Sequence, residues 1–172
     1  MGTHIPRWIE TSNGHDTQMY VFCVASERAY GANLYVRSTT PEGIIVRLSC
    51  SKNRLAPVKK ITLSRLELLA ALVGARSLQY FCREIGLHIR NATLWTDATV
   101  VLCWIRRNPR WETFICNRIT EIQTYTTPTQ CKHCPEEDNP AVYLTRGVNA
   151  DQLKGLDAWW TWPAWLSMCV EF

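Results

Sequence analysis

The stretch from Asn91 to Ile105 constrains the fold more tightly than any other part of the chain. A short apolar run ends at Asp97, and apolar residues at helical spacing follow until Asn108-Pro109. This pattern predicts a buried strand that delivers Asp97 at its carboxyl end and continues directly into a helix. Ligands of open α/β sheets bind beyond the carboxyl ends of strands, so an acid there is placed for chemistry. Spacing alone nevertheless favours a capping role, because Asp is a preferred N-cap residue.

Length and composition indicate a single globular domain. The chain has 172 residues, enough to bury a substantial core without disulfide bonds. Most of its eight cysteines stand singly within apolar runs, which indicates free thiols in a reducing compartment. No stretch is long and apolar enough to span a membrane, and the first residues lack the apolar run of a signal peptide. We therefore expect a cytoplasmic or nuclear protein without a membrane partner.

Three segments near the N-terminus predict strands at hairpin spacing. Residues 19–24 are apolar on both faces, as in a central strand, and residues 29–37 follow after a short turn. The third segment, from Ile44 to Cys50, alternates apolar and polar residues, so one of its faces should meet water. Together they predict an antiparallel meander, preceded by a polar lead-in over residues 1–18.

The longest helix is predicted from Ser64 to Ile85, with Gly86 as its C-terminal cap. Ser64-Arg-Leu-Glu67 matches a capping box, in which the Glu67 side chain would bond the start of the helix. Glu67 also shares a side of the helix with small residues as far as Gly74, which would let the helix approach a sheet closely. Glu67 is thus either a cap or an inward-facing ligand, and the pattern by itself favours the cap.

Helices and strands alternate in the second half of the chain. We expect a helix from Trp111 to Tyr125, a short strand from Gln130 to Cys134, and a last helix that starts at Asp138-Asn139-Pro140 and ends at Gly147. The complete order is β-β-β-α-β-α-α-β-α. It predicts an α/β fold with a mixed five-stranded sheet, first three strands antiparallel, and helices on the faces.

A string of short segments, in a fixed order along nearly the whole chain, resembles a known family. The segments are Phe22–Gly31, Arg65–Leu72, Leu94–Val100, Asn117–Gln123, Asp138–Ala141, Thr145–Gly147 and the Trp-rich tail. They are similar to the RNase H-like domain of BEL/Pao-type retrotransposon polyproteins, in which protease, reverse transcriptase and integrase modules flank this domain. We expect the RNase H-like domain over residues 19–147 and a Trp-rich arm or linker over residues 148–172.

The resemblance implies a two-metal phosphodiesterase site built from four carboxylates. They lie at the end of the first strand, on the long helix, at the end of the fourth strand and on the last helix. Two divalent ions about 4 Å apart must be held by negative oxygens, so that one activates water and the other stabilises the leaving oxygen. Glu67 and Asp97 fall on two of these positions. For both residues, the resemblance therefore favours metal ligands over caps.

The other two positions hold valine. The family's Asp-Ala-Ser is Val24-Ala25-Ser26 in this chain, and its Asn-Pro-Ala-Asp is Asn139-Pro140-Ala141-Val142. Valine cannot ligate a metal, although Mg²⁺ can bind through only one or two carboxylates. We therefore expect Mg²⁺ or Mn²⁺ to bind weakly or at a single site, if at all. Asp138 stands one helical turn before Val142 and could substitute as a ligand, but it fits better as the start of the helix.

Three hypotheses of function follow. The first is an RNase H-like domain that ancestrally cut the RNA strand of RNA–DNA hybrids and is now catalytically impaired, with Ser26 and Asn139 on the sugar-phosphate backbone. The second is a non-catalytic module in which basic residues such as Lys59 and Lys60 hold the hybrid or another nucleic acid. The third is an unselected transposon remnant.

Three other features have simpler explanations. His133 lies on the predicted last strand, before the loop where a mobile catalytic histidine would be expected, so a structural role is favoured. Cys131-Lys-His-Cys134 has the spacing of half a zinc site, but no second pair follows it. The Trp-rich tail could stack on bases, but packing against the domain is favoured.

Overall fold

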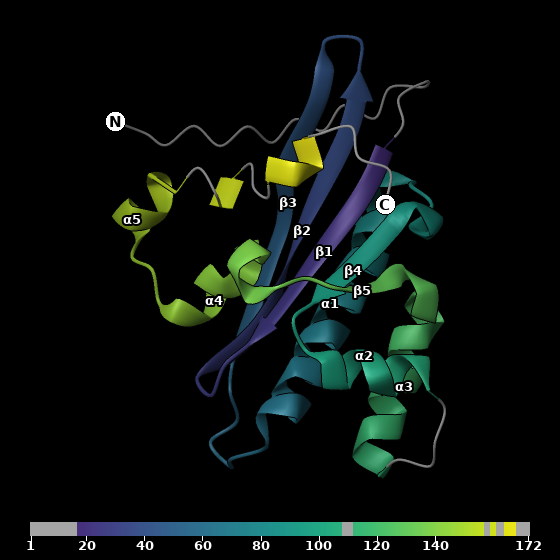
Figure 1. The fold of residues 1–172 in the computed structure, drawn as a ribbon, viewed down its shortest axis with the longest axis vertical. Coiled ribbons are helices and arrows are strands. Elements are labelled where there is room, and N and C mark those ends of the chain that lie inside the picture. The colour runs from purple at the N-terminus through teal and green to yellow at the C-terminus, as the bar shows by residue number, and fades with distance from the viewer. Residues whose placement is uncertain (1–16, 108–111, 157–158, 161–163, 168–172) are drawn as a thin grey trace.

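The computed structural model describes residues 17–107, 112–156, 159–160 and 164–167. Its five strands form one sheet in the order β3-β2-β1-β4-β5 (Figure 1). The strands are β1 (Thr17–Ala25), β2 (Ala29–Thr40), β3 (Gly43–Leu55), β4 (Ala92–Thr96) and β5 (Cys131–His133). β1, β2 and β3 pair antiparallel, whereas β4 pairs parallel to β1 and β5 pairs parallel to β4. This topology confirms the predicted mixed sheet.

Helices follow the strands in the predicted order. The α-helices are α1 (Leu63–Ile85), α2 (Thr99–Arg106), α3 (Thr113–Tyr125), α4 (Tyr143–Arg146) and α5 (Ala150–Lys154). Short 3-10 turns are η1 (Ile89–Asn91), η2 (Pro128–Gln130), η3 (Glu136–Asp138), η4 (Pro140–Val142) and η5 (Ala164–Ser167). The predicted last helix is therefore two 3-10 turns followed by one α-helical turn. Asn108-Pro109 and Trp111, which were expected to bound α2 and α3, lie outside the described residues.

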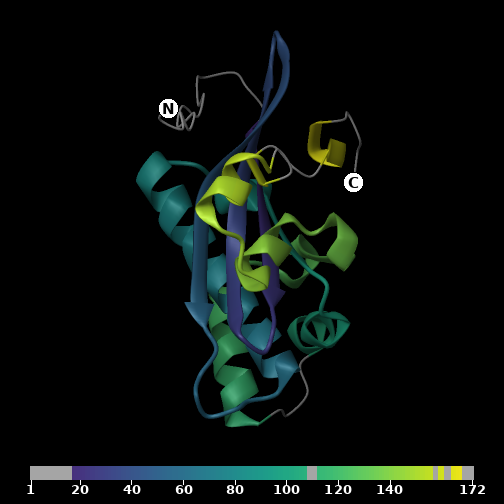
Figure 2. The ribbon, with the colours of Figure 1, turned by 90° about the vertical axis from the view of Figure 1, so that its left-hand side faces the viewer.

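Alternating residues of β1 separate two hydrophobic cores, one on each face of the sheet. Val21 and Cys23 belong to the larger core, which α1, α2 and α3 cover. Phe22 and Val24 belong to a second core, to which η4 and η5 contribute. Figure 2 places α1 and η5 on opposite sides of the sheet. This alternation explains why β1 is apolar on both faces, as a central strand should be.

Gly74 lets α1 approach β1 closely. A Cβ atom at Gly74 would lie 2.7 Å from Cys23 Sγ and 2.9 Å from Val21 Cγ1, both too short for real contacts. The small-residue side of the helix therefore faces the sheet, as the sequence suggested. Glu67 lies two turns earlier on the same side, and Gly86 ends the helix with φ 70°.

The described part of the Trp-rich tail packs on the sheet. Trp159 and Leu166 are buried, with 5% and 0% of their surface exposed. Two side chains of β2 bond tail carbonyls: the Tyr35 hydroxyl donates to Trp159 O at 2.8 Å, and Arg37 Nε donates to Leu166 O at 2.7 Å. Trp159 and Leu166 are thus tied to the sheet. Among the helices that the structure describes, none has the length and apolar character needed to cross a bilayer.

Candidate nuclease-like site

The candidate site lies where β1 and β4 end side by side. Cys23 pairs with Thr96 as the last partners of this parallel ladder, so Val24 and Asp97 follow at neighbouring positions. Two bonds from the later part of the chain fix this end of the sheet. Asn139 Nδ2 donates to Cys23 O at 2.9 Å, and the backbone N–H of Cys134 donates to Thr96 O at 3.1 Å. The segment that carries Val142 is thereby held against the carboxyl ends of both strands.

Asp97 does not cap the helix that follows it. The N-cap residue of α2 is Ala98, and no side chain bonds the start of this helix. The backbone N–H of Ala98 donates instead to Thr96 Oγ1 at 3.2 Å. Asp97 is half-buried, and its Oδ1 atom is buried without a hydrogen-bond partner. The capping role that spacing favoured is therefore wrong for Asp97.

Burial raises the pKa of the Asp97 carboxyl above its ordinary value. A hydrogen bond from its own backbone N–H lowers this pKa, the charge of Glu136 raises it, and the charge of His133 lowers it. Burial dominates, because removing a carboxylate from water disfavours its charged form. A partly buried carboxylate with one oxygen that lacks a hydrogen-bond partner is a suitable ligand for a cation.

Glu67 is half-buried and faces the site. The N-cap of α1 is Thr62, one residue before Leu63, and no side chain bonds the start of the helix. Ser64 is therefore already inside the helix, and the predicted capping box with Glu67 is wrong. Burial first, and then the charge of Asp97, raise the pKa of Glu67. The two carboxylates thus lie close enough to repel each other.

The two valines at the remaining positions are buried. Val24 is 4% exposed and Val142 is 7% exposed, and both belong to the second core. Neither side chain carries an oxygen that could ligate a metal. Across the part of the chain that the structure describes, no three His, Cys, Asp or Glu side chains are grouped to hold a metal ion. Glu67 and Asp97 are thus the two carboxylates at the four expected positions, and Val24 and Val142 supply no oxygen ligand at the other two.

Asn139, and not Asp138, begins the last helical segment. Asn139 is the N-cap of η4, and its Oδ1 accepts from the Ala141 N–H at 3.0 Å. Its side chain is 1% exposed and is bonded at both ends within the chain, so it has no surface for a sugar-phosphate backbone. Asp138 is the last residue of η3 and is partly exposed. The prediction that Asp138 starts the last helix is therefore wrong.

The remaining residues expected to contact nucleic acid lie on two loops. Ser26 Oγ accepts from the N–H groups of Arg28 and Ala29, so it shapes the turn between β1 and β2 while staying partly exposed. Lys59 and Lys60 are exposed in the loop between β3 and α1.

His133 and the two neighbouring cysteines take separate places. His133 is exposed at the end of β5, paired with Thr96, and its charge reaches Asp97. The structural role that the sequence favours for His133 stays a prediction. Cys131 belongs to the larger core and Cys134 to the second core, so the two thiols lie on opposite faces of the sheet. This geometry does not make half a zinc site.

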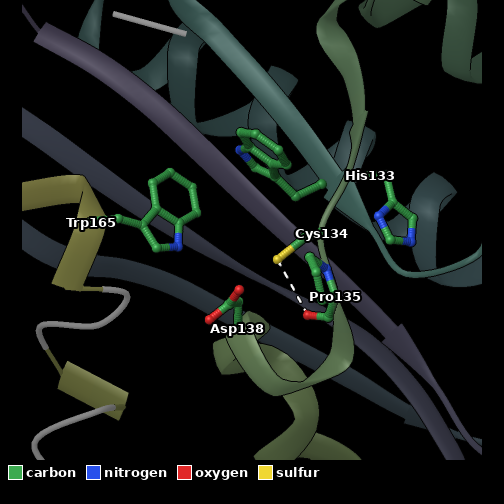
Figure 3. Close-up of a pocket in the computed structure, with 6 residues that line it drawn as sticks. His133, Cys134, Pro135, Asp138 and Trp165 are labelled. Atoms are coloured by element: carbon green, nitrogen blue, oxygen red, sulfur yellow. Dashed lines mark hydrogen bonds between the residues drawn. The ribbon is translucent and has the colours of Figure 1, made fainter. Parts of the chain in front are cut away.

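A pocket lined from three separate parts of the chain lies near His133 and has no local signature in the sequence. A cavity of about 210 Å³ is lined by Trp95, His133, Cys134, Pro135, Asp138 and Trp165 (Figure 3). Trp165 is far from the others along the chain, so spacing could not bring it here. The only available signal was the apolar, aromatic composition of the tail.

A family model described as the Pao retrotransposon-like RNaseH-like domain matches residues 1–98. This match covers more than half of the chain. The chain belongs to this family. The sheet topology described above is that of an RNase H-like fold, as the family description leads one to expect.

Solved RNase H structures resemble the chain at low identity. RNase H1 from the halophilic archaeon Halobacterium salinarum is 10% identical with a TM-score of 0.44, over 70% of this chain and 86% of that chain. LC11-RNase H1 in complex with RNA/DNA hybrid is 16% identical with a TM-score of 0.46, over 72% and 88%. LC11-RNase H1 isolated from compost by a metagenomic approach is 15% identical with a TM-score of 0.41, over 72% and 86%. No curated protein matches the chain.

Proposed function

We propose that this chain is a Pao-type RNase H-like domain whose ancestral metal-dependent cleavage of the RNA strand in RNA–DNA hybrids is severely impaired. One observation carries the proposal. Two of the four positions expected to hold metal-binding carboxylates are buried valines in a continuous hydrophobic core. An apolar side chain cannot replace the oxygen ligand that a hard divalent cation requires.

The surviving carboxylates support binding of a single cation. Glu67 and Asp97 are partly buried, the charge of Asp97 raises the pKa of Glu67, and Asp97 Oδ1 has no hydrogen-bond partner. Glu67 and Asp97 would neutralise only part of the charge of Mg²⁺ or Mn²⁺. Val24, at the end of β1, would supply no further oxygen ligand. In a two-metal mechanism both ions are needed to stabilise the attacking and the leaving oxygens. A single ion would therefore leave the leaving oxygen uncompensated.

A comparison of the parent chain with the variant Val24→Asp, Val142→Asp tests the proposal. Each protein is incubated with a labelled RNA–DNA hybrid and Mg²⁺ or Mn²⁺, and the RNA products are resolved. We expect no cleavage by the parent and measurable cleavage by the variant. The matched control adds Glu67→Gln to the variant, which removes a surviving ligand at nearly constant size and should abolish the restored cleavage. Cleavage by the parent would contradict the impaired site and would direct attention to Asp138.

A second candidate function is nucleic-acid binding without cleavage, favoured by the exposed basic loop. Lys59 and Lys60 are exposed there, and Lys52 and Arg54 are exposed on the adjoining strand β3. Exposed lysines bind phosphates mainly by releasing counterions, so affinity should fall as salt rises. By contrast, Arg65 of the same basic stretch is paired with Glu112 and lies over the Phe114 ring, which reduces its availability.

Salt-dependent binding of a labelled hybrid tests this candidate. The variant Lys59→Ala, Lys60→Ala should weaken binding and should lower the slope of log K against log salt by about one to two. Lys154→Ala, on α5, removes an exposed lysine elsewhere, one that pairs with Asp151, and should leave the slope unchanged. Equal slopes for all three proteins would contradict binding through this loop.

A further inference from the structure

The cavity of about 210 Å³ on the second face of the sheet has two tryptophan walls. The ring centroids of Trp95 and Trp165 lie 5.3 Å apart, and the ring planes meet at 67°. Indole rings set at such an angle form adjacent walls of a corner. Figure 3 shows the Asp138 carboxylate between Trp165 and Pro135, with Cys134 beside Pro135. The volume lies below the roughly 300 Å³ at which pockets for drug-sized ligands begin, so the ligand must be small.

Carboxylates act on the Cys134 side of the pocket. Burial first, and then the charges of Asp138, Asp97 and Glu137, raise the pKa of the Cys134 thiol to about 12. Three carboxylates therefore act on one side chain of the wall. A phosphate or another anion is disfavoured in this environment, and a cation is favoured.

The chain itself supplies a cation that lies against one of these rings. Lys132 Nζ lies 5.7 Å from the centroid of the Trp95 ring. Lys132 and Trp95 are direct partners in the β4–β5 ladder, and Phe22 lies against the same indole from β1. The π-face of a tryptophan attracts cations most strongly among the aromatic side chains. The Trp95 ring therefore already has one cation, the Lys132 ammonium group, over its π-face.

We propose that this pocket binds a methylated ammonium group. Such a group is a soft cation with an apolar shell, which matches two indole walls and a carboxylate at the same time. It would rest against Trp95 and Trp165 with its charge towards Asp138. A free ammonium ion fits less well, because it would lose strong hydration without enough hydrogen-bond acceptors in the pocket. The proposal does not depend on the nuclease-like chemistry of the neighbouring site.

Choline and its neutral isostere 3,3-dimethyl-1-butanol test the proposal on the intact chain. The two molecules share a shape and differ in charge. Binding is followed by NMR from the indole N–H signals, assigned with the Trp165→Leu variant. We expect choline to shift the signals of Trp95 and Trp165 and to bind about tenfold more tightly than the isostere. Equal affinity for both molecules, or shifts confined to other indoles, would overturn the proposal.

Two substitutions separate charge recognition from packing. Asp138→Asn keeps the size of the side chain and should weaken choline binding severalfold while leaving the isostere unaffected. Lys132→Met removes the competing cation and should tighten choline binding. Asp151→Asn removes a 94%-exposed carboxylate on α5 and serves as the matched control, with no effect expected. Unchanged affinity in both Asp138→Asn and Lys132→Met would overturn the proposal even if the parent binds choline.

A peptide with one trimethyllysine distinguishes the source of the group. Tighter binding by the peptide than by choline would support a methylated protein partner. Tighter binding by choline would support a free small molecule. Stacking of a nucleobase is the alternative occupant of two tryptophan walls. Stronger binding of adenosine than of choline would overturn the proposal.

Discussion

Asp97 is the residue whose environment differs most from what an ionised carboxylate requires. It is half-buried, its Oδ1 atom has no partner, and burial raises its pKa. A raised pKa in the folded state means that folding favours the protonated form. The contribution of this group to stability is therefore complete below about pH 4, and it is lost as pH rises through the folded-state pKa.

Asp97→Asn should accordingly stabilise the chain at neutral pH in the presence of a chelator. Removing an uncompensated charge from a functional position typically gains about 0.5–1 kcal/mol, which corresponds to about 1–4 °C in Tm for a chain of this size. Thermal unfolding at pH 4 and pH 7 measures the effect, and the gain should be larger at pH 7. Glu27→Gln removes an exposed charge in the β1–β2 turn and should not reproduce this difference. Equal gains at both pH values would contradict an uncompensated Asp97 charge.

At the scale of elements, the contact between α1 and β1 sets the position of Glu67. Gly74 has no room for a side chain, because Cys23 and Val21 occupy the space around it. Gly74→Ala should destabilise the chain by about 1–3 kcal/mol, since overpacking forces side chains or backbone to move. Gly155→Ala serves as the control, because a Cβ there meets only the Gln152 carbonyl oxygen, at 3.8 Å. Denaturant unfolding compares the two variants, and equal stabilities would contradict the close approach of α1.

The elements differ in how well local pattern determines them. The expected N-cap of α1, Ser64, lies two residues after the observed N-cap, Thr62, because both are good cap residues. This shift of two residues decides whether Glu67 can cap. β3 ends at Leu55, whereas the sequence pattern predicted an end at Cys50. The additional residues are exposed, and their pairing with β2 keeps them in the strand. Such long-range pairing leaves no periodic signal.

At the scale of the whole molecule, the sequence predicted the sheet topology but not what covers its second face. The pocket and the tail contacts join residues more than a hundred positions apart, such as Arg37 with Leu166. Val24 lies on β1, Glu67 on α1 and Asp97 directly after β4, as the resemblance implied, whereas Val142 lies on the 3-10 turn η4 and not on an α-helix. The resemblance could not predict that the Asn139 side chain is buried and hydrogen-bonded to the backbone of Cys23 and Ala141, because burial depends on the final packing.

The tail should therefore contribute to global stability. Leu166→Ala removes a side chain with 0% exposure from the second core and should cost about 2–5 kcal/mol. Leu55→Ala makes the same chemical change at a residue that is 84% exposed and should stay within about 0.5 kcal/mol of the parent. Equal effects of the two substitutions in denaturant unfolding would mean that the tail is a separate arm.

The loss of the two carboxylates has a consequence for folding as well as for catalysis. Val24 and Val142 are packed in the second core, whereas an aspartate at either position would be a buried charge. In a chelator, Val24→Asp, Val142→Asp should destabilise the chain by about 2–4 kcal/mol. A divalent ion that binds only the folded state would then restore about 2.7 kcal/mol at a hundredfold excess over Kd.

Thermal unfolding with and without Mg²⁺ measures this coupling directly. We expect a large gain in Tm on Mg²⁺ addition for the double variant and little or none for the parent chain. Val46→Asp is the matched control, because Val46 is 6% exposed in the same core but lies on β3, away from Glu67 and Asp97. Its loss of stability should not be reversed by Mg²⁺. A double variant that also fails to respond would mean that positions 24 and 142 do not face the same ion as Glu67 and Asp97. An equally large gain in Tm for the parent chain on Mg²⁺ addition would mean that two carboxylates suffice for tight Mg²⁺ binding. The impairment would then lie in the cleavage step and not in metal affinity.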